Sequence, residues 1–221
     1  MYAEEDYSFE EYHLGGLIKN SNLRETIEFI DNTNIAKLDE AAFTYEVNTN
    51  PQDWIFNDFD RIFDLAVEAT NSSQTQYDIF GHSAGGQILH RSAIFFPQSK
   101  ANRIIASNSG FYTTVDSKMK LPFGIQNTLL NDEKLKQSFN KKMILLIGEL
   151  DDENENGGTL LYSVSANQQG AHRLARGQYF YNQSEKISKE IGANFNWEIK
   201  IVPNVGHDQR QMSIAAAEFL Y

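Results

Sequence analysis

The stretch that decides the fold is Gly81-His82-Ser83-Ala84-Gly85-Gly86. It directly follows the apolar run 77–80 and directly precedes a helical pattern, so it predicts a strand, a very tight turn and then a helix. In a G-x-S-x-G turn the central residue is held in a strained backbone conformation, and the flanking glycines let neighbouring backbone pass where a Cβ atom would clash. The turn is therefore expected to lift the hydroxyl of Ser83 clear of the sheet, as a nucleophile requires.

Three further apolar runs follow, at 103–107, 143–147 and 197–202, and each is typical of a buried parallel strand. The second of them opens into Glu149-Leu150-Asp151-Asp152, and the third leads through a proline to His207. An acid and a histidine thus follow the serine in that order, each just beyond the carboxyl end of a predicted strand.

This order and placement resemble the alpha/beta-hydrolase superfamily, whose members arrange nucleophile, acid and base along the chain in this sequence. The resemblance covers roughly residues 50–221. It implies an α/β fold with a mainly parallel sheet of at least four strands flanked by helices, in a single domain spanning residues 1–221.

The resemblance also implies a catalytic role for each motif residue. Ser83 would be the nucleophile, His207 the general base and Asp151 the carboxylate that orients the imidazole. The backbone N–H of Ala84 would lie in the oxyanion hole. The implied reaction is hydrolysis of a small or medium carboxylic ester through an acyl-enzyme, and no cofactor is expected.

Asp152 is an alternative triad acid, because the two carboxylates are adjacent in the chain. Asp151 is preferred because similar sequences carry a Gly-Glu-x-Asp string at this point. The run 169–173, Gln-Gly-Ala-His-Arg, is followed by Arg176-Gly177 and also resembles a group of small bacterial serine hydrolases. This second resemblance indicates no substrate.

The acidic stretch that begins at Asp151 suggests a different hypothesis, a calcium-binding loop. Asp152, Asn154, Asn156 and Gly157 fit the start of such a loop. The twelfth position, which needs a bidentate glutamate, is Ser163, and a strand precedes the loop where an EF-hand has a helix. A solvated acidic turn is therefore the preferred interpretation, and no metal site is expected.

The connection 108–142 is too long for a simple crossover and is expected to form a lid or a pocket wall. Phe111, Tyr112 and Phe123 would supply apolar surface for the acyl or alcohol group, or would only anchor the loop to the core. His82 is expected to pack or hydrogen-bond beneath the turn, beside the substrate pocket.

Helical patterns fill the spaces between the predicted strands. The string Asn50-Pro51-Gln52-Asp53 predicts an N-cap with proline at the first helical position, and a helix to about Ala69. A longer helix is predicted over 174–191, ending at Gly192 where a left-handed cap is usual, and a last one over 212–219. Their apolar stripes are interpreted as core faces.

The first fifty residues are polar and show few strand signals apart from 43–47. The N-terminal half of the usual hydrolase sheet is therefore predicted to be missing, together with the loop that supplies the second oxyanion N–H. The strand at 77–80 would then be an open apolar edge, which invites pairing with another chain.

Two explanations of the missing strands stay open. The chain is part of a longer enzyme, or it is shortened and covers the edge with its own N-terminal segment or with a partner subunit in a homo-oligomer. The alternative function is a hydrolase fold that binds or scaffolds without turnover.

Composition narrows the possible partners. The formal net charge is −11 and no basic stripe is present, which argues against a nucleic-acid partner and leaves a small-molecule ester. The absence of cysteine excludes disulfides and thiolate metal sites. The start, Met1–Asp6, is acidic and lacks the apolar core of a signal peptide, and no segment reaches the length of a membrane span. A cytoplasmic location is expected for this sequence.

Overall fold

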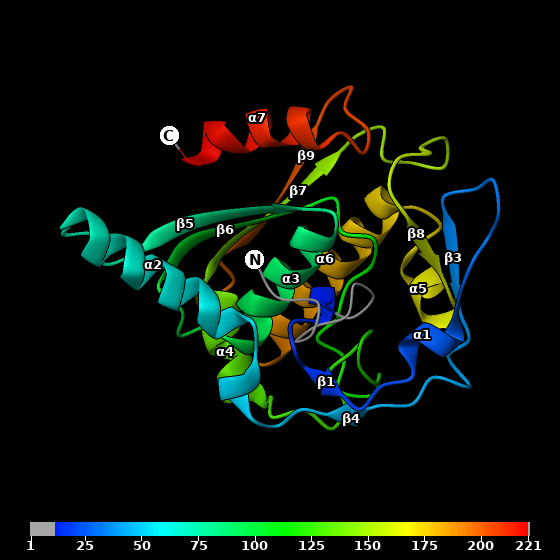
Figure 1. Cartoon of the computed structure of the whole chain (residues 1–221), viewed down its shortest axis with the longest axis horizontal. Coiled ribbons are helices and arrows are strands. Elements are labelled where there is room, and N and C mark those ends of the chain that lie inside the picture. The colour runs from blue at the N-terminus through cyan, green and yellow to red at the C-terminus, as the bar shows by residue number, and fades with distance from the viewer. Residues whose placement is uncertain (1–11, 221) are drawn as a thin grey trace.

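The computed structural model describes residues 12–220, and a four-stranded parallel sheet lies at its centre (Figure 1). The strands follow the order β5-β6-β7-β9, which is also their order along the chain. Every neighbouring pair is parallel, with continuous register over most of each strand. The prediction of a parallel sheet of at least four strands is confirmed. The strands are β5 (Tyr77–His82), β6 (Ala101–Ser107), β7 (Lys142–Gly148) and β9 (Trp197–Val202).

Helices cover both faces of this sheet. On one face α3 (Ala84–Phe95) packs against β5 and β6, and α6 (Arg173–Glu190) packs against β7 and β9. On the other face α7 (Gln209–Leu220) contacts β5, β6 and β7, and Figure 1 shows it alone on that side. A further helix, α4 (Asp132–Asn140), packs against α3 and α6. Among the described residues, none of the helices is both long and apolar enough to cross a membrane.

The main core lies between the sheet and α3, α4 and α6. All residues of α3 from Gly86 to Phe95 are buried, so this helix is the centre of the domain. The opposite face of the sheet holds a smaller core under α7. The predicted helices over 174–191 and 212–219 are confirmed as α6 and α7, and Gly192 has the expected positive φ of 65° after α6.

The N-terminal segment holds more strands than its sequence indicated. Each is only two to four residues long, which is too short to show a period-two pattern. They form a pair, β1 with β4, and a three-stranded sheet in the order β2-β3-β8. None joins the parallel sheet, so β5 is its edge, as predicted. The elements are η1 (Tyr12–Leu14), β1 (Ile18–Lys19), α1 (Leu23–Thr26), β2 (Ile27–Phe29), β3 (Ile35–Leu38), β4 (Glu46–Val47), β8 (Leu160–Tyr162) and α5 (Val164–Gln169).

The helix predicted from Asn50 to about Ala69 is divided in two. The Asn50 side chain does cap Gln52 N, but the element that follows is only a three-residue 3-10 turn, η2 (Pro51–Asp53). The α-helix proper, α2 (Phe56–Thr70), begins after a break at Trp54, whose backbone is extended. The indole of Trp54 is buried and donates to Asn48 O, which holds the break in place.

The apolar stripe of α2 is a core face only over its first turn, so that interpretation was wrong for the rest of the helix. Ile62 is 58% exposed and Leu65 is 65% exposed. The physical reason is that β5 is a sheet edge, and the described part of the chain packs no strand against this side of the helix. Asp60 anchors α2 instead, by accepting from Tyr77 Oη and Lys100 N. Figure 1 shows α2 extending away from the rest of the fold.

Candidate active site

Ser83 lies at the apex of the turn between β5 and α3. Its backbone has φ 57° and ψ −116°, a sparsely populated conformation for a residue with a side chain. Two backbone hydrogen bonds hold it there: Ser83 N donates to Ser107 O at 2.8 Å, and Gln87 N donates to Ser83 O at 3.0 Å. The strained nucleophile turn expected from the sequence is present.

The glycines around Ser83 differ in purpose. A Cβ at Gly81 would lie 2.6 Å from Gly85 O, and one at Gly86 would clash with the backbone oxygen of Ser107. A Cβ at Gly85 would meet nothing within 4 Å. The close backbone approach therefore depends on Gly81 and Gly86, whereas Gly85, the second glycine of the motif, faces open space.

The structure brings together the three residues that the strand order predicted. His207 Nε2 lies 3.0 Å from Ser83 Oγ, and His207 Nδ1 lies 2.8 Å from Asp151 Oδ2. Because a carboxylate only accepts, Nδ1 carries a proton and Nε2 is left to accept from the serine hydroxyl. Each residue follows the carboxyl end of a different strand: β5 for Ser83, β7 for Asp151 and β9 for His207.

Asp151 is fully buried and is held by three partners. Besides His207, it accepts from Arg173 Nη1 at 3.0 Å and from Asn108 Nδ2 at 2.5 Å. Burial alone would raise the pKa of Asp151, but the hydrogen bond from His207 and the charge of Arg173 outweigh it, so the pKa lies below its ordinary value. The carboxylate is therefore ionised at neutral pH.

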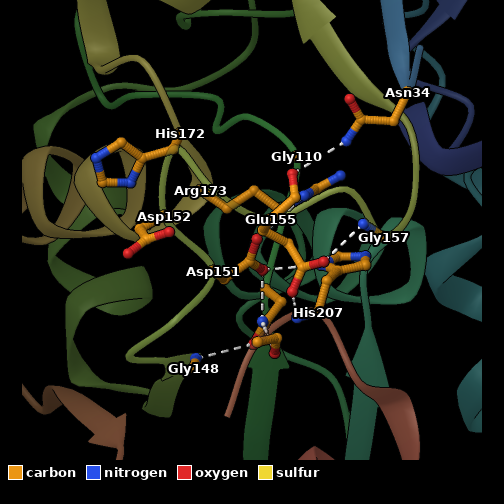
Figure 2. Close-up of polar contacts among 12 residues, drawn as sticks. Asn34, Gly110, Gly148, Asp151, Asp152, Glu155, Gly157, His172, Arg173 and His207 are labelled. Atoms are coloured by element: carbon orange, nitrogen blue, oxygen red, sulfur yellow. Dashed lines mark hydrogen bonds and ion pairs between the residues drawn. The ribbon is translucent and has the colours of Figure 1, made fainter. Parts of the chain in front are cut away.

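Asp152, the alternative acid, points elsewhere. Its Oδ1 accepts from Asn154 N at 2.9 Å within its own turn. Figure 2 shows Asp152 on the side of Asp151 away from His207, with His172 nearby. In this geometry Asp151, and not Asp152, contacts the imidazole.

Asn108 joins the three loops of the site, and sequence reasoning missed it. Its Nδ2 donates to Asp151 and to Gly206 O, and its Oδ1 accepts from Gly148 N at 3.3 Å. It directly follows β6 in the left-handed conformation, with φ 47°. Asparagine tolerates this conformation better than most residues, so an asparagine directly after a predicted strand was the available signal.

Arg173 was quoted only as part of a string and its role was missed. Its side chain is 1% exposed and forms a buried ion pair with Asp151, while Nη2 donates to Thr159 O at 2.9 Å. It begins α6, and nothing in the sequence connects that position with the end of β7. The Asp151 carboxylate thus contacts Arg173, Asn108 and the imidazole of His207.

Glu155 gives the acidic turn a structural role that the sequence did not indicate. Its two carboxylate oxygens accept from His207 N at 2.5 Å and from Gly157 N at 2.6 Å (Figure 2). The oxygens of this turn are thus directed to backbone N–H groups, and no cluster of His, Asp or Glu in residues 12–220 could hold a metal ion. The turn fixes the loop that carries His207.

His82 lies beside the Ser83-His207-Asp151 contacts. Its Nδ1 is 3.3 Å from Ser107 Oγ, which in turn donates to Asn108 Oδ1, and its ring centroid is 4.6 Å from that of His207. Burial, followed by the neighbouring charge of His207, lowers the pKa of His82 to about 4. His82 is thus neutral at pH 7 and hydrogen-bonds beneath the turn, as expected.

A cavity of about 380 Å³ opens beside Ser83 and Ala84, and we call it the Ser83 cavity. The N–H of Ala84 lies in the first turn of α3, where no helical acceptor is available, so it is free to bind an oxyanion. The 3-10 turn Tyr12–Leu14 forms the neighbouring wall, a place where sequence reasoning expected no N-terminal element.

Only some of the expected pocket residues line the cavity. His82 and Phe111 line the Ser83 cavity. Tyr112 and Phe123 do not: Tyr112 is fully buried and stacks on Phe180, with ring centroids 4.7 Å apart, and Phe123 packs under Phe111. The other walls come from α1 and from the small sheet β2-β3-β8, whose short strands gave no sequence signal.

Comparisons with known proteins agree with this geometry. The chain is 30% identical to poly(aspartic acid) hydrolase-1 from Sphingomonas sp. KT-1, with a TM-score of 0.79 over 98% of this chain and 73% of that one. It matches LpqC, a poly(3-hydroxybutyrate) depolymerase from Bordetella parapertussis, at 23% identity and a TM-score of 0.77, over 100% of this chain and 68% of that one. No family model and no curated protein matches the sequence. On the first of these likenesses and on the fold, the chain belongs to the alpha/beta-hydrolase superfamily.

Proposed function

We propose that the chain is a serine hydrolase that cleaves a small or medium carboxylic ester through an acyl-enzyme. The observation that carries this proposal is the continuous set of contacts from Ser83 through His207 to the ionised, buried Asp151. A serine hydroxyl is too weak an acid to attack a carbonyl unaided, and this arrangement supplies the base that it needs.

The proposed steps use the contacts described above. Ser83 Oγ attacks the ester carbonyl as its proton passes to His207 Nε2, and the tetrahedral oxyanion accepts from the N–H of Ala84. Asp151 stabilises the imidazolium and keeps its ring in place. The imidazolium then protonates the departing alcohol, and the same nitrogen activates the water that cleaves the acyl-enzyme.

The named substrates of the similar proteins indicate a bond class and no more. By their names, one similar protein hydrolyses poly(aspartic acid) and another depolymerises poly(3-hydroxybutyrate), which is a polyester. Both bonds are acyl bonds that a serine nucleophile can cleave. We propose an ester because ester hydrolysis is common on this fold and because the neighbours include a polyester-cleaving protein.

A fluorophosphonate probe tests the proposal. We expect it to label the wild type at Ser83 and to leave Ser83→Ala unlabelled, with the exposed control Ser72→Ala labelled like the wild type. Ser83→Ala should also lose about 10⁴-fold or more in kcat with p-nitrophenyl butyrate. A folded wild type that is neither labelled nor active would favour a binding or scaffold protein that retains the fold without turnover.

A further inference from the structure

The Ser83 cavity has a wall made by residues distant in the sequence. Ile27, Phe29, Ala36 and Leu38 of β2 and β3, together with Leu161 of β8, contribute its apolar side. Figure 1 shows β3 and β8 beside the end of the parallel sheet toward which its strands run. The small sheet thus lies where one end of a substrate bonded to Ser83 must extend.

No charged side chain lines this cavity within the described part of the chain. Its polar residues are uncharged, and its two histidines, His13 and His82, are neutral at pH 7. Burial lowers the pKa of His13 to about 3 and that of His82 to about 4, with the neighbouring charges of Arg91 and His207 acting in the same direction. A carboxylate placed here would lose its water and gain no cation in return.

Arg91 and Arg173 lie behind the walls, and neither lines the cavity. Arg91 lies under the ring of Phe111, with its guanidinium carbon 5.0 Å from the ring centroid, and its Nη1 donates to His13 O at 2.8 Å. Arg173 is bound to Asp151. An anionic substrate in the cavity would therefore contact neither guanidinium: Arg91 lies against the ring of Phe111, and Arg173 is paired with Asp151.

The charge of the whole chain acts in the same direction. A net charge of −11 repels polyanions at long range and slows their approach. Poly(aspartic acid), the substrate in the name of the similar protein, is such a polyanion at neutral pH.

From these observations, and on the basis of the function proposed above, we propose that the Ser83 cavity binds the acyl group, and that it selects an uncharged aliphatic chain of medium length over one that carries a carboxylate. The small sheet β2-β3-β8 determines this specificity. The volume of the Ser83 cavity, about 380 Å³, is near the lower end for a small-molecule pocket, so the preference has an upper limit in chain length.

A series of p-nitrophenyl esters tests the chain-length preference. We expect kcat/KM to rise about 3- to 4-fold per methylene from acetate through butyrate to hexanoate, because each added methylene leaves water for an apolar wall. It should fall again for laurate, which is too long for the cavity. A flat series, or activity confined to acetate, would overturn the proposal.

A pair of similar size tests the charge preference. We expect p-nitrophenyl hemisuccinate to be cleaved at least about 10-fold less efficiently than the valerate ester, and poly(aspartic acid) to be left uncleaved. Equal or better cleavage of the hemisuccinate would overturn the proposal while the proposed hydrolase function stands. If Ser83 takes no probe and no ester is cleaved, the proposed function fails, and this inference fails with it.

Two exposed residues provide a matched pair of variants. Phe29, which lines the cavity, is 56% exposed, and Ile62 on α2, which does not, is 58% exposed. Phe29→Lys should lower kcat/KM for the hexanoate about 10-fold and raise the ratio of hemisuccinate to valerate cleavage. Ile62→Lys should change neither. Both substitutions are at the surface, so melting curves should match the wild type, and identical effects of the two variants would remove the small sheet from the substrate site.

Discussion

The parallel sheet and the small sheet β2-β3-β8 contribute different parts of the candidate site. The parallel sheet has strands of six or seven residues with continuous register over most of their length, and its strand ends position the three side chains of the proposed chemistry. The small sheet has strands of three or four residues and contributes apolar wall. On the proposals above, reactivity depends on the long regular strands, whereas selectivity depends on the short ones.

The largest expected effect comes from breaking the chemistry of the parallel sheet at Asp151. Asp151→Asn should lower kcat by about 10³- to 10⁴-fold, because an amide cannot hold the required imidazole tautomer or stabilise its charge. Asp152→Asn is the matched control, since its side chain contacts only its own turn, and should stay within about 2-fold of the wild type. Ester kinetics on both variants measure the difference. Equal losses would mean that the adjacent carboxylates share the role.

Arg173 provides the next test, because it binds Asp151 from the start of α6. Arg173→Met should lower the free energy of unfolding by about 3 kcal/mol, since it leaves a buried carboxylate without its cation. It should also reduce kcat by about 10- to 100-fold as Asp151 shifts. Urea denaturation and ester kinetics measure the two effects. A variant with wild-type stability would show that Asn108 and His207 suffice to hold the carboxylate.

The same variant has a signature in pH. The pKa of Asp151 is depressed in the folded state, so its contribution to stability is complete above the ordinary value of 3.8 and is lost as the pH falls through the lower, folded value. Removing Arg173 raises the folded pKa and shrinks this contribution. Acid unfolding of Arg173→Met should therefore begin at a higher pH than that of the wild type, as followed by circular dichroism.

Glu155 tests whether the acidic turn helps to position His207 for the proposed chemistry. Glu155→Gln retains one acceptor but turns a nitrogen toward the N–H of His207 or Gly157, so the loop should shift and kcat should fall about 10-fold. The neighbouring exposed Glu153→Gln is the control and should behave as the wild type. A change in KM alone would point to substrate binding and not to the placement of His207.

The smallest expected effect separates fold from site within the nucleophile turn. Gly86→Ala should destabilise the protein by about 1–3 kcal/mol, because its methyl group meets the backbone of β6. Gly85→Ala should leave stability near the wild type but place a methyl group at the cavity, lowering kcat/KM. The melting temperature should therefore fall in Gly86→Ala and stay near the wild type in Gly85→Ala, whereas Gly85→Ala should show the loss in kcat/KM. Equal destabilisation by both would show that the turn tolerates no Cβ at either glycine.

Sequence reasoning identified the long strands and the residues that follow them, and it missed what holds those residues in place. Ser83, Asp151 and His207 could be found because each follows a strong apolar run or a short motif. Asn108 carried one signal, an asparagine directly after a predicted strand, but Glu155 and Arg173 could not be found, because their partners lie far away in the chain and their own neighbours carry no periodic signal. The cavity walls were predicted only in part: Gly110, Phe111 and Pro122 of 108–142 do line the cavity. The walls from the N-terminal segment and β8 were missed, because strands of two to four residues leave no measurable pattern.

The two strands that carry nucleophile and base have one further consequence. Ser83 follows β5 and His207 follows β9, and these are the opposite margins of the four-stranded sheet. The loops that carry Ser83 and His207 therefore meet across the two intervening strands, β6 and β7, although the strands that they follow do not pair with each other. A change of twist at any of the three strand pairs between them therefore alters the distance between Ser83 Oγ and His207 Nε2, and with it the proton transfer proposed above.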